Sequence, residues 1–190
     1  MYKAITLLTL TATLNLLGQG FAHAFCAGAI VKEIQSIAKK PEVVEAVKLA
    51  NLNPPLPADL HALDARWIAS NGQEAEARKI LASTASEFLR KTLEKRVYFK
   101  EAILTGKLGE TVAMNMVTSD YWQGDEEKFT EIFDTNQPSR KPDFYISRAR
   151  WDESVKSMIS QVSVPVYDSA SMIGTLTIGI DLKRVPQQNH

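Results

Sequence analysis

Cysteine and histidine are scarce in this sequence. It contains one cysteine, Cys26, and three histidines among 190 residues. A single thiol cannot form a disulfide within the chain, so the hydrophobic core alone must stabilise the fold. The small number of histidines argues against a histidine-dependent catalytic triad and against a multi-histidine zinc site.

Other signatures of catalysis are also missing. The sequence has no Gly-x-Ser-x-Gly nucleophile motif, no phosphate-binding Gly-x-x-x-x-Gly-Lys loop and no dinucleotide fingerprint. Carboxylates such as Asp120, Asp125 and Asp152 could gather around a hard cation, but no regular calcium-loop spacing supports this. We therefore predict a protein that is not an enzyme and that holds neither a cofactor nor a metal ion.

Charge of one sign is not in excess. Twenty-two Lys and Arg balance 22 Asp and Glu, which gives a formal net charge of zero. No long run of basic residues could follow a phosphate backbone. Nucleic acid is therefore not an expected partner.

The N-terminus has the pattern of an export signal. Lys3 precedes the mostly apolar run Ile5–Leu17, and Ala22–Ala24 offers the small-x-small pattern of a cleavage site. We predict a signal peptide over residues 1–24 and a periplasmic or secreted protein that does not span a membrane after cleavage. An uncleaved anchor is the alternative, although the apolar run is short for a bilayer. The bulky residue before Cys26 argues against a lipid anchor, and modification of this thiol is left open.

Apolar periodicity predicts helices in the first half of the chain. We expect two helices in Ile30–Leu52, separated at Pro41, and a shorter helix in Leu60–Trp67. Residues 25–72 are therefore predicted to form an N-terminal helical segment. The stretch Glu74–Arg96 is rich in helix formers and predicts one long helix.

After Val97 the apolar period changes from that of a helix to that of a strand. A short helix is expected after Asp125, and the last strand should bury one face and expose the other. The predicted strands are Tyr98–Leu104, Thr111–Val117, Phe144–Trp151, Ser157–Tyr167 and Met172–Leu182. This order predicts an α+β fold, a five-stranded antiparallel sheet preceded by a long helix, over residues 73–185, with residues 186–190 as a tail.

The densest polar and aromatic cluster lies between the predicted second and third strands. In the stretch 118–126, Tyr121 and Trp122 offer flat walls, and Asp120 and Asp125 offer carboxylates that could orient a small ligand. The alternative is structural: the two rings cap the sheet, and the two acids cap local turns and a helix. The sequence leaves both readings open.

Five segments resemble the single-Cache, PDC-type family of bacterial periplasmic sensors. They are Leu63–Trp67, which is similar to the segment before the long helix of that family, and Thr118–Glu126, Trp151–Ser154, Gln161–Val166 and Ile173–Leu182. The resemblance implies a PAS-like fold that binds an organic acid, an amino acid or a related metabolite between the sheet and the segment joining its second and third strands. It carries over Tyr121, Trp122 and Asp125 as candidate pocket residues.

Two features depart from the family. The first hairpin turn, Thr105–Glu110, lacks the usual single glycine, because it contains two. Family members also often belong to membrane-anchored receptors, whereas this sequence is expected to carry no output module.

A second candidate ligand site lies on the predicted middle strand. Arg148, Arg150 and Asp152 alternate, so they share one face of that strand. Guanidinium groups bind carboxylates bidentately, and a carboxylate clamp is therefore one reading. A solvated face of paired charges is the other.

The sequence thus predicts an exported sensor domain that binds a small metabolite in signal transduction. The competing prediction is an interaction module that docks a membrane receptor, or forms a homodimer, without a small ligand. That alternative requires an exposed apolar patch around Phe88 and Leu89 and a pocket too small for a metabolite.

Overall fold

The computed structural model describes residues 27–133, 142–153 and 156–186. The predicted signal peptide (1–24), Cys26 and residues 187–190 of the predicted tail lie outside the described residues. Within the described part of the chain, no helix combines the length and the apolarity needed to cross a membrane.

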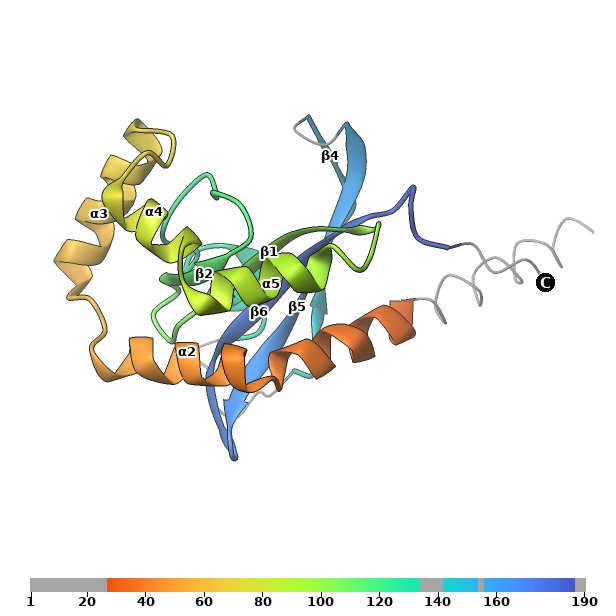
Figure 1. The fold of residues 1–190 in the computed structure, drawn as a ribbon, viewed down its shortest axis with the longest axis horizontal. Helices are drawn as coiled ribbons and strands as arrows, with labels where there is room; N and C mark the ends of the chain where they lie inside the picture. The colour runs from red at the N-terminus through yellow and green to blue at the C-terminus, as the bar shows by residue number, and fades with distance from the viewer. Residues whose placement is uncertain (1–26, 134–141, 154–155, 187–190) are drawn as a thin grey trace, which may run out of the picture.

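The first helices pack along one face of the sheet (Figure 1). Residues 27–38 are helical, and α2 (Pro41–Leu52) follows, with the proline in its first turn, where a missing N–H costs nothing. Ile34 and Val47 are fully buried against the sheet. The predicted pair of helices separated at Pro41 is confirmed.

Three further helices precede the sheet. They are α3 (Pro57–Ala69), α4 (Ala75–Leu81) and α5 (Thr84–Leu93). α3 and α4 surround a second, smaller core cluster centred on the fully buried Trp67. The chain turns between these two helices at Asn71 and Gly72, which both have positive φ.

The prediction of one long helix over Glu74–Arg96 was wrong, because the helix breaks between α4 and α5. Ser83 caps α5 by accepting a hydrogen bond from Ser86 N at 3.2 Å. The Ser86 hydroxyl donates to Ile80 O at 2.7 Å and accepts from Met114 N at 3.0 Å. These bonds join the end of α4, the start of α5 and a strand, so the break lets both helices pack on the sheet.

The second half of the chain forms one antiparallel sheet. Its strands are β1 (Phe99–Thr105), β2 (Thr111–Met114), β3 (Tyr145–Ile146), β4 (Arg150–Asp152), β5 (Ser157–Asp168) and β6 (Ser171–Asp181). The order across the sheet is β2-β1-β6-β5-β3, and β4 also pairs with β5. The α+β prediction is confirmed.

The predicted middle strand Phe144–Trp151 is divided into β3 and β4 at one edge of the sheet. Tyr145 opposes Ser163, whereas Arg150 opposes Ile159, so the register shifts by one residue between the two pieces. At the break, the Ser147 side chain takes the place of a ladder partner, because its hydroxyl accepts a hydrogen bond from Gln161 N at 2.9 Å. The predicted five strands therefore become six, although the sheet keeps five positions across.

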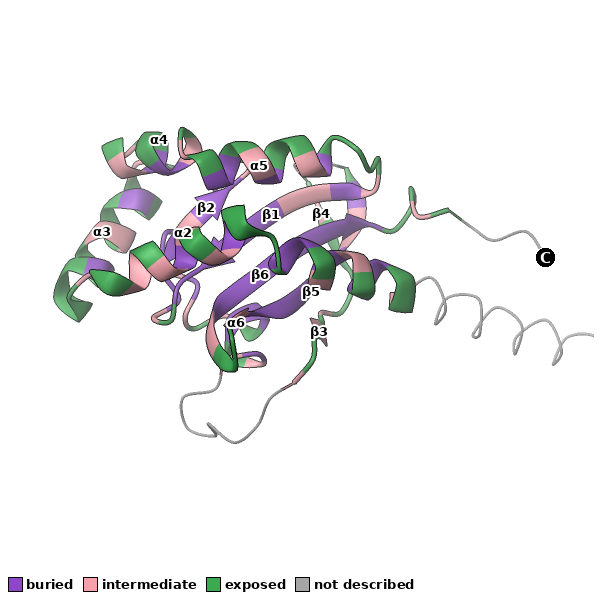
Figure 2. Cartoon of the chain, turned by 60° about the horizontal axis from the view of Figure 1, so that its bottom comes forward, coloured by how far each residue is buried: buried purple, intermediate pink, exposed green. Residues whose placement is uncertain are grey.

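The two faces of the sheet carry different side chains. The helix-facing side is apolar and includes Leu176 and Ile178, both fully buried in the main core. Their strand, β6, is buried along most of its length (Figure 2). The opposite face was expected to be exposed, yet Thr175, Thr177 and Asp181 on it are buried as well. That expectation failed because the segment between β2 and β3, with the short helix α6 (Glu127–Thr130), folds over this face.

Candidate ligand-binding site

A cavity of about 610 Å³ lies on the sheet face opposite the helices. Its floor is made by side chains of β1 and β5, and its walls come from the segment between β2 and β3 and from the β3–β4 edge. The charged and polar residues that line the cavity include Glu101, Lys128, Arg148, Arg150, Asp152 and Gln161.

The floor of the cavity depends on a glycine in the central strand. In the sheet register, Gly179 of β6 lies between Glu101 of β1 and Gln161 of β5. Because Gly179 has no side chain, Gln161 Nε2 reaches across β6 and donates to Glu101 Oε2 at 3.3 Å. A Cβ at Gly179 would lie 3.3 Å from Glu101 Cβ and 3.5 Å from Ile159 Cγ2. The glycine therefore keeps the centre of the floor open.

Glu101 is a half-buried acid on the floor of the cavity. Burial raises the pKa of its carboxyl, while the Lys128 ammonium and the Gln161 hydrogen bond act in the opposite direction. Lys128 is itself buried and forms an ion pair with Glu126, Nζ to Oε1, at 2.8 Å. The cavity thus holds a half-buried acid beside a buried lysine that already has its own carboxylate partner.

The opposite wall carries two arginines. Arg148 and Arg150 are exposed, and among the described residues neither guanidinium forms an ion pair or a side-chain hydrogen bond. Tyr145 stands next to them, and its hydroxyl donates to Glu127 Oε2 at 2.8 Å. Two guanidinium groups at the cavity wall are suited to a carboxylate or another planar anion.

Two of the six predicted site residues, Arg148 and Asp152, line this cavity. Asp152 is half-buried, and its charge contributes to raising the pKa of Glu101. The alternation of these side chains along one strand was the sequence signal for them, and the structure brings both to the same wall.

The structure places Tyr121 and Trp122 outside the cavity lining. Tyr121 is buried in the small core cluster, with its ring centroid 5.7 Å from that of Trp67. Trp122 Nε1 donates to Leu108 O at 2.8 Å, and the ring contacts His61 edge-on at 4.6 Å. Both rings therefore act as anchors of the loop, which is the structural alternative left open by the sequence.

A residue that sequence reasoning missed fixes this anchor. Asp64 Oδ1, on α3, accepts hydrogen bonds from the backbone N–H groups of Tyr121 and Trp122, each at 2.9 Å. Burial raises the pKa of the Tyr121 hydroxyl well above its ordinary value. Asp64 lies far away in sequence, and no local pattern indicated that it would bind this loop.

Asp120 and Asp125 also lie outside the cavity lining. Asp120 Oδ1 accepts a hydrogen bond from Gln123 Nε2 at 2.5 Å, within the loop itself. Asp125 is exposed, just before α6. Among the described residues, no group of three or more His, Cys, Asp and Glu is placed to hold a metal ion.

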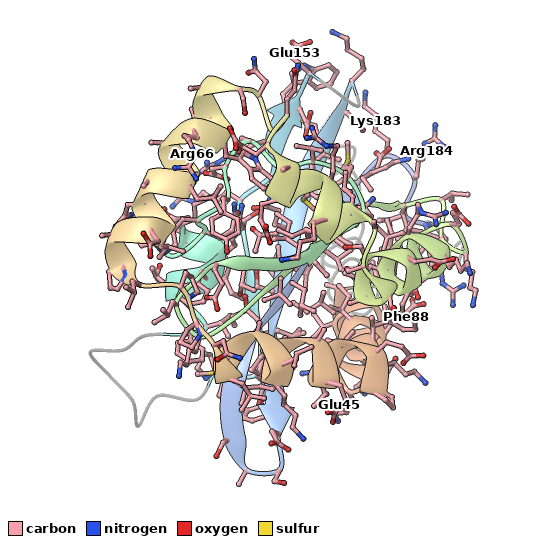
Figure 3. All side chains as sticks on the ribbon, turned by 60° about the vertical axis from the view of Figure 1, so that its left-hand side comes forward. Glu45, Arg66, Phe88, Glu153, Lys183 and Arg184 are labelled. Atoms are coloured by element: carbon pink, nitrogen blue, oxygen red, sulfur yellow. The ribbon has the colours of Figure 1, made fainter. Side chains whose placement is uncertain are left out.

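Sequence reasoning also missed the floor residues Glu101, Gln161 and Gly179. Polar side chains that alternate with apolar ones predict the solvent-exposed face of a strand. That face borders a cavity here only because the segment between β2 and β3 covers it. The apolar patch required by the interaction-module alternative is not present around Leu89, which is fully buried, or Phe88, which is half-buried against the main core (Figure 3).

Solved structures with a similar backbone are sensor domains. The extracellular domain of vpHK1S-Z8, assigned as a histidine kinase, superposes with a TM-score of 0.50 at 12% identity, over 95% of this chain and 62% of that one. The ligand-binding domain of the Pseudomonas aeruginosa chemoreceptor PctC, in complex with GABA, gives 0.48 at 13% identity, over 92% and 62%. The Pseudomonas fluorescens chemoreceptor CtaA, in complex with L-serine, gives 0.43 at 11% identity, over 92% and 60%.

The chain has the Cache-type sensor-domain fold. It spans about three fifths of the length of these three structures, which are ligand-binding or extracellular domains. No family model and no curated protein matches the sequence. The likeness to this Cache fold therefore lies in the backbone, at low sequence identity.

Proposed function

We propose that this protein is an exported sensor domain that binds a small carboxylate-bearing metabolite, an organic acid or an amino acid, in the cavity on the polar face of the sheet. The observation that carries the proposal is the pair of guanidinium groups, Arg148 and Arg150, on one wall of a cavity with a polar floor. The cavity volume of about 610 Å³ lies within the range of small-molecule sites.

The charges suit a ligand with a carboxylate at the wall. A guanidinium group can bind a carboxylate with two parallel hydrogen bonds, and hydrogen bonds to charged groups contribute about 1.5–3 kcal/mol each. Glu101 and Asp152 give the same cavity acidic groups, which favour an ammonium group on the same ligand. A simple dicarboxylate would place its second charge near these acids, so the arrangement favours an amino acid over a dicarboxylate.

Thermal unfolding with a panel of amino acids and organic acids tests the proposal. A ligand at 100 times its Kd stabilises the folded state by about 2.7 kcal/mol, which corresponds to a Tm increase of roughly 5–10 °C for a chain of this size. If no amino acid or organic acid raises the Tm, the proposal fails.

The wall arginines provide the site-specific test. Arg148→Gln and Arg150→Gln remove exposed charges, so each variant should fold normally and lose about 10- to 100-fold in affinity for the compound found in the screen. Arg66→Gln and Arg78→Gln, which remove arginines of α3 and α4 outside the cavity, are the matched controls. Equal affinity in all four variants would remove the carboxylate-binding wall from the proposal.

Export is tested separately. We expect the protein to be recovered from the periplasm or the medium with Phe25 as its first residue, because Ala24 ends the small-x-small pattern. N-terminal sequencing of the fractionated protein measures this. An intact N-terminus at Met1 in the cytoplasmic fraction would contradict it.

A further inference from the structure

Both ends of the described chain leave the molecule at one end. The helix over residues 27–38 begins there, and the residues after β6 leave on the same side in both views (Figures 1 and 2). The turn after α5 lies there too, because Asp181 N donates to Tyr98 O at 2.8 Å. We call this end the terminal face and define it by Lys95, Arg96, Val97, Trp151, Leu182, Lys183 and Arg184.

Three large apolar side chains are exposed on the terminal face. Val97, Trp151 and Leu182 have 64%, 50% and 43% of their surface exposed. They follow one another across the ends of the strands: Leu182 N donates to Met158 O at 3.0 Å, and Met158 is the register partner of Trp151. Exposed apolar groups are common singly, but here they adjoin basic residues.

The terminal face carries several basic side chains, some of which have acidic partners. Arg96 Nε lies 2.8 Å from Glu33 Oε1, and Glu153 Oε1 accepts a hydrogen bond from Trp151 Nε1 at 2.8 Å. The buried carboxylate of Asp181 forms ion pairs with two cations, Lys100 Nζ at 3.8 Å and Arg184 Nε at 3.4 Å. Among the described residues, Lys95 and Lys183 have no carboxylate partner, and the Lys183 ammonium lies 5.0 Å from the centre of the Trp151 ring. Within the described part of the chain, Lys95 and Lys183 are therefore the basic side chains of the terminal face that no carboxylate neutralises.

We propose that the terminal face docks on an anionic membrane surface, with Lys95 and Lys183 near lipid phosphates and with Val97 and Leu182 in the interfacial layer. Basic side chains interleaved with Trp and aliphatic residues are the composition that binds at a charged bilayer interface. A nucleic acid could pair with Lys95 and Lys183 but would leave the side chains of Val97 and Leu182 in water. The proposal does not depend on the function of the cavity.

Vesicle sedimentation of the full chain tests the electrostatic part. Phosphatidylcholine vesicles are compared with an equal mixture of phosphatidylcholine and phosphatidylglycerol, so that any contribution of residues 1–26 to neutral lipid is measured separately. The wild type should bind the anionic vesicles more tightly, and the Lys95→Gln/Lys183→Gln variant should lose about 5- to 30-fold of that binding. Lys79→Gln/Lys107→Gln, which removes two exposed lysines elsewhere, is the control and should bind as the wild type does.

A second pair of variants tests the apolar part. Val97→Ser should weaken binding to the anionic vesicles by about three- to tenfold, because one partly inserted aliphatic side chain is lost. Ile68→Ser, at an exposed position of α3, should have no effect. Trp151 is left unchanged because it also lines the cavity.

Three results would overturn the proposal. One is equal binding to neutral and anionic vesicles, and another is an equal loss in the control pair of lysines. The third is binding to double-stranded DNA as tight as to anionic vesicles, together with no effect of Val97→Ser, which would make the terminal face a general polyanion surface. A circular-dichroism melt of each variant separates these results from loss of the fold.

Discussion

The two faces of the sheet are built from the same strands and have different roles. On β6, Leu176 and Ile178 point to the helices and form part of the main core, whereas Thr175 and Thr177 point to the other side. There, the hydroxyl of Thr177 pairs with that of Ser163 at 2.8 Å, and the hydroxyl of Thr175 with that of Thr105 at 2.7 Å. The apolar face supplies stability, and the polar face, being satisfied internally, can border a cavity without a large cost.

The largest expected loss of stability comes from a substitution on the apolar face. Ile178→Ala should lower the free energy of unfolding by about 3–4 kcal/mol, because it leaves a cavity at a fully buried position. Chemical denaturation measures the change. Thr177→Ser, one residue earlier on the other face, retains the hydroxyl and is the control, with an expected loss below about 1.5 kcal/mol. Similar losses in both variants would contradict the division of roles.

The next effect separates the loop anchor from the cavity. Trp122→Ala removes the ring that contacts His61 and the indole N–H that binds Leu108 O, so stability should fall by about 2–3 kcal/mol. Ligand affinity of the folded variant, measured calorimetrically, should change less than about threefold, because Trp122 does not line the cavity. A complete loss of binding with an intact fold would place the ligand against Trp122.

A third substitution fills part of the cavity above the polar face. Gly179→Leu places an aliphatic side chain on the cavity floor between Glu101 and Gln161, and ligand affinity should fall by at least about tenfold. Gly28→Leu is a suitable control, since nothing lies within 4 Å of a Cβ built at Gly28. If Gly179→Leu binds the ligand as tightly as the wild type, the ligand does not reach the floor.

The smallest effect concerns the pH dependence of stability. Burial raises the folded-state pKa of Glu101. Its unfavourable contribution to stability is therefore absent below the ordinary glutamate pKa of about 4.3, grows as the pH rises from there to the raised value, and stays constant above it. Glu101→Gln should therefore match the wild type near pH 4 and have the higher Tm at pH 7. Glu42→Gln, which changes an exposed acid of α2 outside the cavity, is the control. A Tm difference for Glu101→Gln that does not change with pH would argue against this charge effect.

Much of the fold followed from local pattern. The hydrophobic period separates helices from strands at Val97, Pro41 separates two helices, and β5 and β6 correspond to the last two predicted strands. The errors have a common origin. Helix propensity alone could not reveal that Ser83 and Ser86 would bond across the break between α4 and α5, because Ser86 is positioned by Met114, far away in sequence.

The candidate site was only partly predictable. The alternation of Arg148 and Asp152 along one strand is a sequence signal, and both line the cavity. The aromatic pair Tyr121 and Trp122 carried the resemblance to the family but anchors the loop to α3 through Asp64. A polar-aromatic cluster has the same composition whether it binds a ligand or a neighbouring helix, so composition could not separate the two.

The sequence by itself determined the order of helices and strands and which strand positions are apolar, because both follow from the spacing of side chains along the backbone. Only the tertiary structure decided which polar residues face a cavity. Glu101 and Gln161 are 60 positions apart, and they meet because β6 lies between their strands with a glycine at the point of contact. Strand order and the path of the covering segment are global properties of packing, and no local pattern contains them.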